Sequence, residues 1–233
     1  MTDIHQHILW GLDDGPEQPQ GMQAMLRKAA KQRVTRIAAT PHVCPGFEPF
    51  DPGVYYERLG EAQAYCDSNG LGIQLMPGAE VAWTYQTAEA LRRGKVPTLG
   101  DTDCVLIELW RDVSWSDVRA AVSGVLRTGF VPVLAHIERY RCFVWQPGRA
   151  LALKHELPVG YQVNASTIIE PCGFMVKRFV RQMLDERGID AVASDAHDAK
   201  ERPVRMDEAY RALKESCSAG YAEELVNFNG VVR

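Results

Sequence analysis

The chain has 233 residues, of which 46% are hydrophobic and 24% are charged, and its formal net charge is −4 at pH 7. This length and composition are typical of a globular protein, and we expect residues 1–233 to form a single domain. The negative charge argues against nucleic acid as the main partner, and because no run of about 18 apolar residues is present we expect no membrane insertion.

Apolar, β-branched runs alternate with segments of helical period along the chain. In chain order, the expected strands are Ile4 with its neighbours, 34–40, 73–76, 104–109, 131–135, 161–164 and 189–194. The expected helices between them are 21–32, 55–68, 87–93, 115–127, 148–155, 173–187 and 204–217. About seven β-α units without a change in composition predict an α/β fold with one parallel sheet, closed or nearly closed as a barrel. Gly94, Gly129 and Gly188 stand where helix C-caps are expected.

The six cysteines are spread along the chain without a Cys-x-x-Cys pair. Reduced thiols in a cytoplasmic protein are the interpretation that this spacing favours. A homo-oligomer is compatible with the sequence.

Histidines and carboxylates stand at the C-terminal ends of the expected strands, where barrels place their catalytic groups. The candidate metal ligands are His5, His7, Asp14, His42, Glu80, Glu108, His136, Asp195 and His197. Each alone has an ordinary explanation, such as a surface histidine, an ion pair or a turn residue. Their recurrence at five strand ends indicates one site. Imidazole and carboxylate ligands suit divalent ions such as Zn, Mn or Fe, and so many of them predict several ions and hydrolytic chemistry.

These residues stand in motifs that resemble the polymerase and histidinol phosphatase (PHP) superfamily. The motifs are His5-Gln-His7, Ala39-Thr-Pro-His42, Pro77-Gly-Ala-Glu80, Leu106-Ile-Glu108, Ala135-His-Ile-Glu-Arg139 and Ala193-Ser-Asp-Ala-His197. Asp13-Asp-Gly-Pro16, and Arg202-Pro203 followed by Met206-Asp-Glu-Ala-Tyr210, resemble one branch: the bacterial manganese-dependent protein tyrosine phosphatases encoded with capsule and exopolysaccharide genes.

The resemblance implies a distorted (β/α)7 barrel of PHP type that holds three divalent metal ions, with Mn favoured and Fe, Co or Zn as alternatives. Carried over by position, it implies one ion on His5, His7, Glu80 and Asp195, a second on Glu80, Glu108 and His136, and a third on Asp14, His42 and His197. Asp13 is the rival of Asp14. The chain departs from the family at Ile137, where proline is usual. This change adjoins Arg139 and removes no ligand.

The expected activity is hydrolysis of phosphotyrosine in proteins by a metal-bridged hydroxide. Arg139 and Arg202 are the candidates for holding the phosphate oxygens, and His42 or His197 for a general acid. The expected substrate is the tail of a bacterial tyrosine kinase that controls capsule or exopolysaccharide synthesis. The alternative is a phosphatase of histidinol phosphate or another small phosphomonoester. A non-catalytic module and a polymerase-associated nuclease are less favoured, because every ligand is present and no basic stripe is seen.

Two further features of the sequence bear on the mechanism and the substrate. Cys172 and Arg178 have the Cys-x5-Arg spacing of thiolate tyrosine phosphatases. Phe174, Met175, Val176, Phe179 and Val180 predict the apolar face of a helix there, so we interpret the spacing as chance. Around the predicted site, Trp110 follows Glu108 closely, and the loop 44–56 carries aromatic candidates for a substrate entrance: Phe47, Phe50, Tyr55 and Tyr56.

Overall fold

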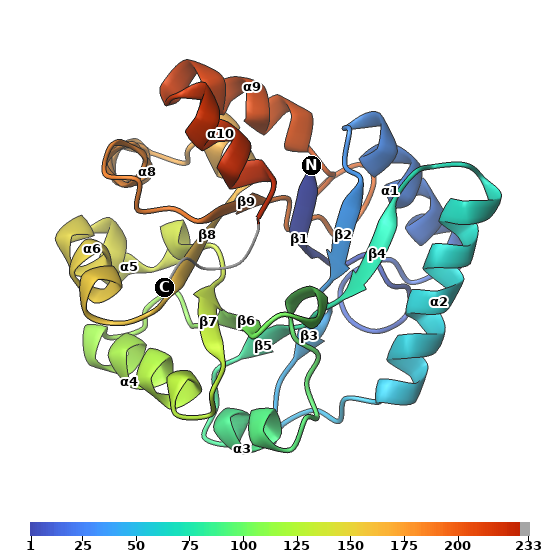
Figure 1. Cartoon of the computed structure of the whole chain (residues 1–233), viewed down its shortest axis with the longest axis horizontal. Helices are drawn as coiled ribbons and strands as arrows, with labels where there is room; N and C mark the ends of the chain where they lie inside the picture. The colour runs from blue at the N-terminus through green and yellow to red at the C-terminus, as the bar shows by residue number, and fades with distance from the viewer. Residues whose placement is uncertain (229–233) are drawn as a thin grey trace.

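A curled ring of parallel strands surrounded by helices makes up the computed structural model, which describes residues 1–228 (Figure 1). The strands are β1 (Thr2–Gln6), β2 (Arg36–Ala39), β3 (His42–Val43), β4 (Gln74–Pro77), β5 (Glu80–Ala82), β6 (Cys104–Glu108), β7 (Val131–Leu134), β8 (Gly160–Asn164) and β9 (Ala191–Ala193). The helices are α1 (Pro19–Lys31), α2 (Pro52–Ser68), α3 (Thr87–Arg92), α4 (Trp115–Leu126), α5 (Arg141–Val144), α6 (Pro147–Glu156), α7 (Ala165–Ile169), α8 (Phe174–Asp185), α9 (Met206–Ser216) and α10 (Ala219–Val226). Short 3-10 turns lie at η1 (Leu99–Asp101) and η2 (Ile137–Arg139).

The strands form two parallel sheets, with orders β1-β2-β4 and β3-β5-β6-β7-β8-β9. Backbone bonds join the last strand to the first: the Asp195 amide donates to the His5 carbonyl at 2.8 Å, and the His7 amide donates to the Ala196 carbonyl at 3.0 Å. Because β2 runs into β3 and β4 runs into β5 after two residues each, the two sheets follow one another around the same ring. The barrel-type α/β expectation is confirmed.

The break between β2 and β3 and the break between β4 and β5 are joined by the side chain of Tyr55, and by a backbone bond in which the Glu80 amide donates to the Pro41 carbonyl at 3.0 Å. The hydroxyl of buried Tyr55 lies 3.0 Å from the carbonyl oxygens of Ala39 and Gly78, and it accepts from the Gly78 amide at 2.8 Å. A Cβ on Gly78 would come within 2.9 Å of the Thr40 Cγ2 atom, so the close approach of the two segments needs glycine. Beyond the breaks, His42 and Glu80 face each other in register.

Apolar side chains form two clusters on opposite sides of the strands, as the two-residue period of a strand dictates. Leu106, Val133 and Ala193 belong to the cluster on the barrel interior, whereas Ile107 and Leu134 belong to the larger cluster that includes residues of the surrounding helices. The interior is therefore apolar below the site, and the polar residues gather at the carboxyl ends of the strands.

Most of the predicted elements are present, with three differences. His42 and Glu80 begin two short strands of their own, β3 and β5, whereas we expected these residues to follow the second and third strands. Helices α5, α7 and α10 are not among the expected elements. At the three expected glycine caps, Gly94 and Gly129 have positive φ (63° and 91°), but at the third it is Arg187 (φ 51°) that adopts this conformation. A Cβ on Gly188 would contact only the flexible ends of side chains at less than 3.4 Å, Met183 Cε at 2.6 Å and Leu151 Cδ2 at 3.0 Å.

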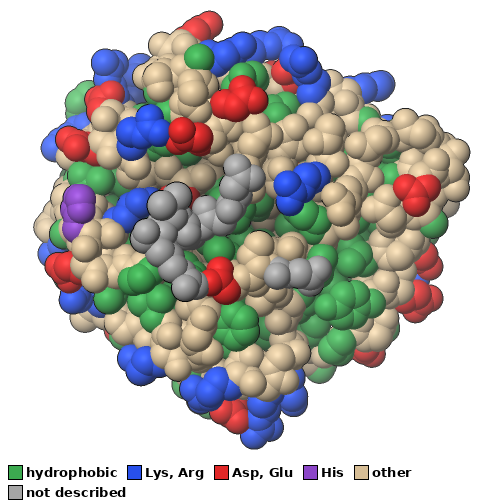
Figure 2. All heavy atoms as spheres, in the orientation of Figure 1, with side chains coloured by type: hydrophobic (Ala, Val, Ile, Leu, Met, Phe, Trp, Pro, Cys, Tyr) green, Lys and Arg blue, Asp and Glu red, His purple; other side chains and the backbone are tan. Residues whose placement is uncertain are grey.

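Charged side chains of both signs are interspersed around the rim of the face shown in Figure 2. Among the described residues, no helix is both long enough and apolar enough to cross a membrane.

Candidate metal centre

The nine expected ligand residues converge at the carboxyl ends of the strands, although they come from distant parts of the chain. Three groups of ligand-type atoms can each hold an ion, because within each group the atoms lie within 4.8 Å of one another. These groups are His5, His7 and Glu80; His42, Glu80 and Glu108; and His7, Asp14, His42 and His197. Asp195 contacts His5 of the first group, and His136 contacts Glu80, which the first two groups share.

Glu80 lies at the middle of the cluster. Its Oε2 atom is 3.2 Å from the Nε2 atoms of both His5 and His7, and its Oε1 atom is 2.8 Å from His136 Nε2. Asp195 Oδ1 is 3.5 Å from His5 Nε2 and 3.7 Å from His7 Nε2. One carboxylate thus faces two sets of imidazoles, which is the position of a group that bridges two ions.

His42 joins the second and third groups, because each of its ring nitrogens faces a different carboxylate. His42 Nδ1 is 3.2 Å from Glu80 Oε2 and 3.8 Å from Glu108 Oε2, and Glu108 Oε1 is 3.5 Å from His136 Nε2. His42 Nε2 is 3.5 Å from Asp14 Oδ1, an atom that also lies 3.2 Å from His197 Nε2.

The structure distinguishes Asp13 from Asp14. Buried Asp13 is occupied by hydrogen bonds: it accepts from His7 Nδ1 at 2.6 Å, from the His42 amide at 2.9 Å and from the Gly15 amide at 2.9 Å. The side chain of Asp14 is 57% exposed and faces the histidines. We therefore favour Asp14 as the ligand and Asp13 as the residue that orients His7.

Hydrogen bonds fix which nitrogen of His5 and His7 faces the centre. Gln162 Oε1 accepts from the His136 amide at 2.7 Å, so it is an acceptor and His5 Nδ1, 3.2 Å away, must be the donor. His7 Nδ1 donates to Asp13 in the same way. The Nε2 lone pairs, 3.4 Å apart, then face each other and the oxygens of Glu80. Buried acceptors that converge without a donor fit a cation, so the residues present suit metal ions.

The pKa shifts of the buried ligands show that carboxylates and imidazoles in the centre strongly affect one another. Burial opposes ionisation of Glu80, but His5 and His136 outweigh it and hold the pKa of Glu80 well below its usual range. Burial also disfavours charged imidazoles, yet Asp13 and Glu80 raise the pKa of His7 to about 10, and Glu108 and Glu80 raise that of His136 to about 9. Each buried contact between a carboxylate and an imidazole is therefore stable when a proton or a metal ion lies between the two groups.

A buried polar network on β8 supports the ligands, and the sequence analysis missed it. Gln162 Nε2 donates to Asn164 Oδ1, and Asn164 Nδ2 donates to Asp195 Oδ2, both at 2.8 Å. The Asn164 amide donates to Glu138 Oε1 at 3.0 Å. The signal was present, because Gln162 and Asn164 alternate at the end of an expected strand, where the other strands carry ligands.

Two of the expected ligands have left-handed backbone conformations. His136 has φ 34° and ψ 55°, and Asp195 has φ 51°. Such conformations are costly for residues other than glycine and persist where the surroundings enforce them, commonly at functional sites. Here the His136 amide is held by Gln162 and the Asp195 amide by the His5 carbonyl.

Arg139 and Arg202 both reach the centre through Asp195. Arg139 Nη2 donates to Asp195 Oδ2 at 2.6 Å, and Arg202 Nη2 donates to Asp195 Oδ1 at 3.3 Å. Both side chains are a little under half exposed. With Lys200 and Arg205 they line a cavity of about 410 Å³ that also contains Asn164, which we call the arginine pocket.

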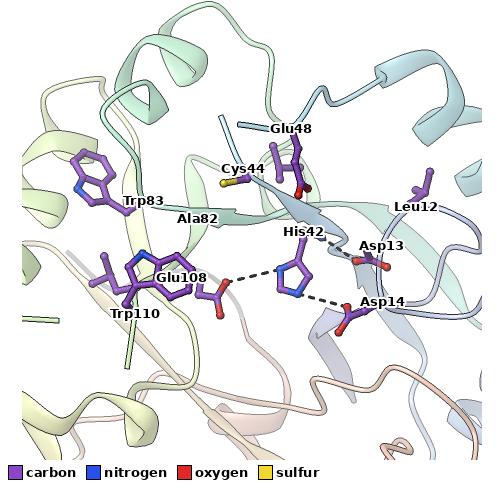
Figure 3. Close-up of a pocket in the computed structure, with 12 residues that line it drawn as sticks. Leu12, Asp13, Asp14, His42, Cys44, Glu48, Ala82, Trp83, Glu108 and Trp110 are labelled. Atoms are coloured by element: carbon purple, nitrogen blue, oxygen red, sulfur yellow. Dashed lines mark hydrogen bonds and ion pairs between the residues drawn. The ribbon is translucent and has the colours of Figure 1, made fainter. Parts of the chain in front are cut away.

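A second cavity of about 410 Å³ adjoins the centre on another side, and we call it the aromatic pocket (Figure 3). Its apolar wall consists of Leu12, Val43, Ala82, Trp83, Leu109 and Trp110. Its polar residues include Asp14, His42 and Glu108 of the metal centre, and Glu48 from the rim. Trp110 is 84% exposed, and Figure 3 shows it beside Glu108.

The expected aromatic entrance is only partly correct. Tyr55 is buried at the strand breaks, and Phe47 and Tyr56 are exposed but do not line the aromatic pocket. Phe50 lines a smaller hollow that shares His42 with that pocket. The tryptophans that adjoin the centre are Trp110, as expected, and Trp83.

The Cys-x5-Arg spacing does not form a phosphate loop. Exposed Cys172 precedes α8, and Arg178 lies within that helix, where it lines a hollow on the outer surface. Phe174 is exposed, so its expected place on the buried face of the helix is wrong, whereas Phe179 and Val180 are buried.

Comparison with known proteins agrees with this geometry. A family model described as "Capsular polysaccharide synthesis, CpsB/CapC" matches residues 1–232. The tyrosine-protein phosphatase CpsB of Streptococcus agalactiae is 31% identical over 220 residues, which cover 91% of this chain and 89% of the relative. The tyrosine-protein phosphatase YwqE of Bacillus subtilis is 28% identical over 92% of this chain and 84% of its own length.

Solved structures show the same fold. One from a study of YwqE from Bacillus subtilis and CpsB from Streptococcus pneumoniae, described there as unique metal-dependent tyrosine phosphatases, has a TM-score of 0.87 and 27% identity. It covers all of this chain and 97% of the other. The histidinol phosphate phosphatase of Lactococcus lactis, at 14% identity and a TM-score of 0.61, covers 92% of each chain and shares the fold. This chain therefore belongs to the CpsB/CapC family of capsular polysaccharide synthesis.

Proposed function

We propose that this protein is a metal-dependent phosphatase that hydrolyses phosphotyrosine in proteins. The observation that carries the proposal is the position of Glu80, whose two oxygens face His5 and His7 on one side and His136 on the other. Three divalent ions, with Mn favoured over Fe, Co or Zn, would be held by three sets of residues. These sets are His5, His7, Glu80 and Asp195; Glu80, Glu108 and His136; and Asp14, His42 and His197. When bound, such ions act as Lewis acids and lower the pKa of water from about 15.7 toward 7.

The protein's own residues supply the rest of the chemistry. Arg139 and Arg202 each have N–H groups beyond those bound to Asp195, and these are placed to hold phosphate oxygens as their charge shifts. Asp195 fixes both guanidinium groups while it contacts His5 and His7. Held in place before the substrate arrives, the arginines need little reorganisation in the transition state.

His42 is the candidate proton donor. It is the one histidine among the described residues that line the aromatic pocket, and its side chain is 37% exposed. As an imidazolium, with neither ring nitrogen on an ion, His42 would pass a proton to the leaving tyrosyl oxygen and become neutral imidazole, so this role and that of metal ligand exclude each other. A phenol has a pKa of about 10, so this leaving group needs less help from an acid than a serine alkoxide does.

The aromatic pocket and the family support a phosphotyrosyl protein as the substrate. Trp83 and Trp110 offer a wall suited to a phenyl ring. We propose that the substrate is the tail of a tyrosine kinase of capsule or exopolysaccharide synthesis, encountered in the cytoplasm. All six cysteines are free thiols in the structure, as expected of a reducing compartment.

The test compares two phosphomonoesters on manganese-loaded protein. We expect turnover of a phosphotyrosyl peptide to exceed that of histidinol phosphate by at least about tenfold, which corresponds to about 1.4 kcal/mol of transition-state preference. A clear preference for histidinol phosphate would overturn the proposal in favour of a small-molecule phosphatase.

A further inference from the structure

The aromatic pocket has a one-sided charge, one part of which does not belong to the metal centre. Among the described residues that line it there is no lysine and no arginine, whereas four carboxylates are present: Asp13, Asp14, Glu48 and Glu108. A phosphotyrosyl substrate is itself an anion. An acidic wall beside its binding site therefore affects which peptides can enter.

Three of these carboxylates already have partners in the centre. Asp13 accepts from His7, Asp14 faces His197 and His42, and Glu108 faces His136 and His42. Glu48 is different, because the described part of the chain provides no ion pair and no side-chain hydrogen bond for it. Its charge remains available to a ligand in the pocket.

The backbone places Glu48 at the rim in a defined position. The amides of Phe47 and Glu48 both donate to the Cys44 carbonyl at 3.1 Å, which forms a tight turn directly after β3. Figure 3 shows Glu48 above His42, on the other side of the pocket from Trp83 and Trp110. Glu48 and the exposed indole of Trp110 therefore lie on different sides of one pocket.

A carboxylate opposite an exposed indole suits a cationic side chain. An ammonium or guanidinium group gains an ion pair with the first and a cation–π contact with the second. The arginine pocket contains four cationic side chains (Arg139, Lys200, Arg202 and Arg205) against two carboxylates (Asp195 and Glu201), so its excess positive charge draws the phosphate there and away from Glu48. The two pockets together favour a substrate whose phosphate and whose neighbouring residues carry opposite charges.

We propose that Glu48 is a specificity-determining residue, which makes the aromatic pocket select phosphotyrosine that is flanked by lysine or arginine and reject phosphotyrosine flanked by acidic residues. This inference rests on the proposed phosphotyrosine phosphatase function and names the peptide class that its site takes. Glu48 acts on binding of the flanking residue, so its effect falls on KM and leaves the chemical step to the metal centre.

The test measures kcat and KM of the full-length, manganese-loaded protein with three phosphotyrosyl peptides that differ only in the flanking residues, which are Lys, Gln or Glu. For the wild type we expect kcat/KM to fall from the Lys to the Glu peptide by about tenfold, through KM, and the ratio to shrink in high salt. In Glu48→Gln the ratio falls by about three- to fivefold, the scale of one exposed ion pair. In Glu48→Lys it inverts.

Glu215→Lys is the matched control. Glu215 is exposed on α9, outside the aromatic pocket, and its replacement changes the net charge by the same amount. A Lys-to-Glu peptide ratio that is the same in Glu48→Lys as in the wild type would overturn the proposal, as would a shift of equal size in Glu215→Lys. If Glu48→Lys fails to bind manganese or to fold by circular dichroism, the ratio of Glu48→Gln decides. Absence of turnover of every phosphotyrosyl peptide by the wild type would refute the proposed function itself.

Discussion

The two cavities that flank the metal centre have the same volume, about 410 Å³ each, and opposite chemistry. The arginine pocket contains Arg139 and Arg202, which contact Asp195, whereas the aromatic pocket contains indoles, aliphatic side chains and carboxylates. A phosphotyrosyl residue has the same two-part character, with a charged phosphate and an apolar ring. The arginines proposed to hold the phosphate and the tryptophans proposed to contact the ring therefore occupy separate walls, so changes of these residues should affect different kinetic constants.

The largest effect is expected in the metal centre that the two pockets flank. His136→Ala removes an imidazole that lies 2.8 Å from Glu80 and 3.5 Å from Glu108, so we expect metal content and activity to be lost together. Elemental analysis and phosphotyrosine turnover on the same preparation test this. His155→Ala, at an exposed histidine of α6, is the control and should change neither. A His136→Ala protein with full metal and full activity would remove this residue from the centre.

The next effect belongs to the arginine pocket alone. Arg139→Ala should lower kcat about 10²-fold, the usual cost of one charge-stabilising donor, while metal content stays at the wild-type level. Arg141→Ala, at an exposed residue paired with Asp112, is the matched control. Metal loss in Arg139→Ala would show that Arg139 holds Asp195 in place rather than the phosphate.

The buried network on β8 should act on metal affinity. Gln162→Leu removes the acceptor of His5 Nδ1 and of the His136 amide, so we expect affinity for Mn²⁺ to fall about 10- to 100-fold, as measured by titration. Gln162→Glu keeps an acceptor oxygen for both groups but loses the Nε2 donor to Asn164 Oδ1, so it should recover only part of that loss. Equal affinities in Gln162→Leu and the wild type would contradict a positioning role.

The smallest effect is expected on the aromatic wall. Trp110→Ala removes an exposed indole, and we expect KM for a phosphotyrosyl peptide to rise about 2- to 10-fold with kcat nearly unchanged, the scale of one aromatic contact. Trp145→Ala, at a tryptophan that is 61% exposed and does not line the pocket, is the control. A fall in kcat with constant KM would move Trp110 from recognition to chemistry.

The convergence of the ligands could be predicted from the sequence because the carboxyl ends of parallel strands meet at one edge. His5 and His136 are 131 positions apart, yet each closes a strand, and that position brings them together. Arg139 and Arg202 could be placed by their short distances in sequence from ligands. The ring of strands followed from the alternation of apolar runs and helical periods.

What could not be predicted depends on the direction of side chains in loops and at strand breaks. Asp13 and Asp14 are neighbours in a turn, and only the fold shows that the first is occupied by His7. Tyr55 is an aromatic residue of the expected entrance loop. Its side chain instead joins the two strand breaks, because its hydroxyl accepts from the Gly78 amide. Gln162 was overlooked because an amide ligates few metals and its role is to orient His5.

The most direct measurement of the central claim is phosphotyrosyl-peptide hydrolysis before and after removal of metal, in the wild type and in Cys172→Ser. We predict that a chelator abolishes the activity of both proteins, that added Mn²⁺ restores it in both, and that Cys172→Ser equals the wild type throughout. Activity that survives complete removal of metal and disappears in Cys172→Ser would contradict the account.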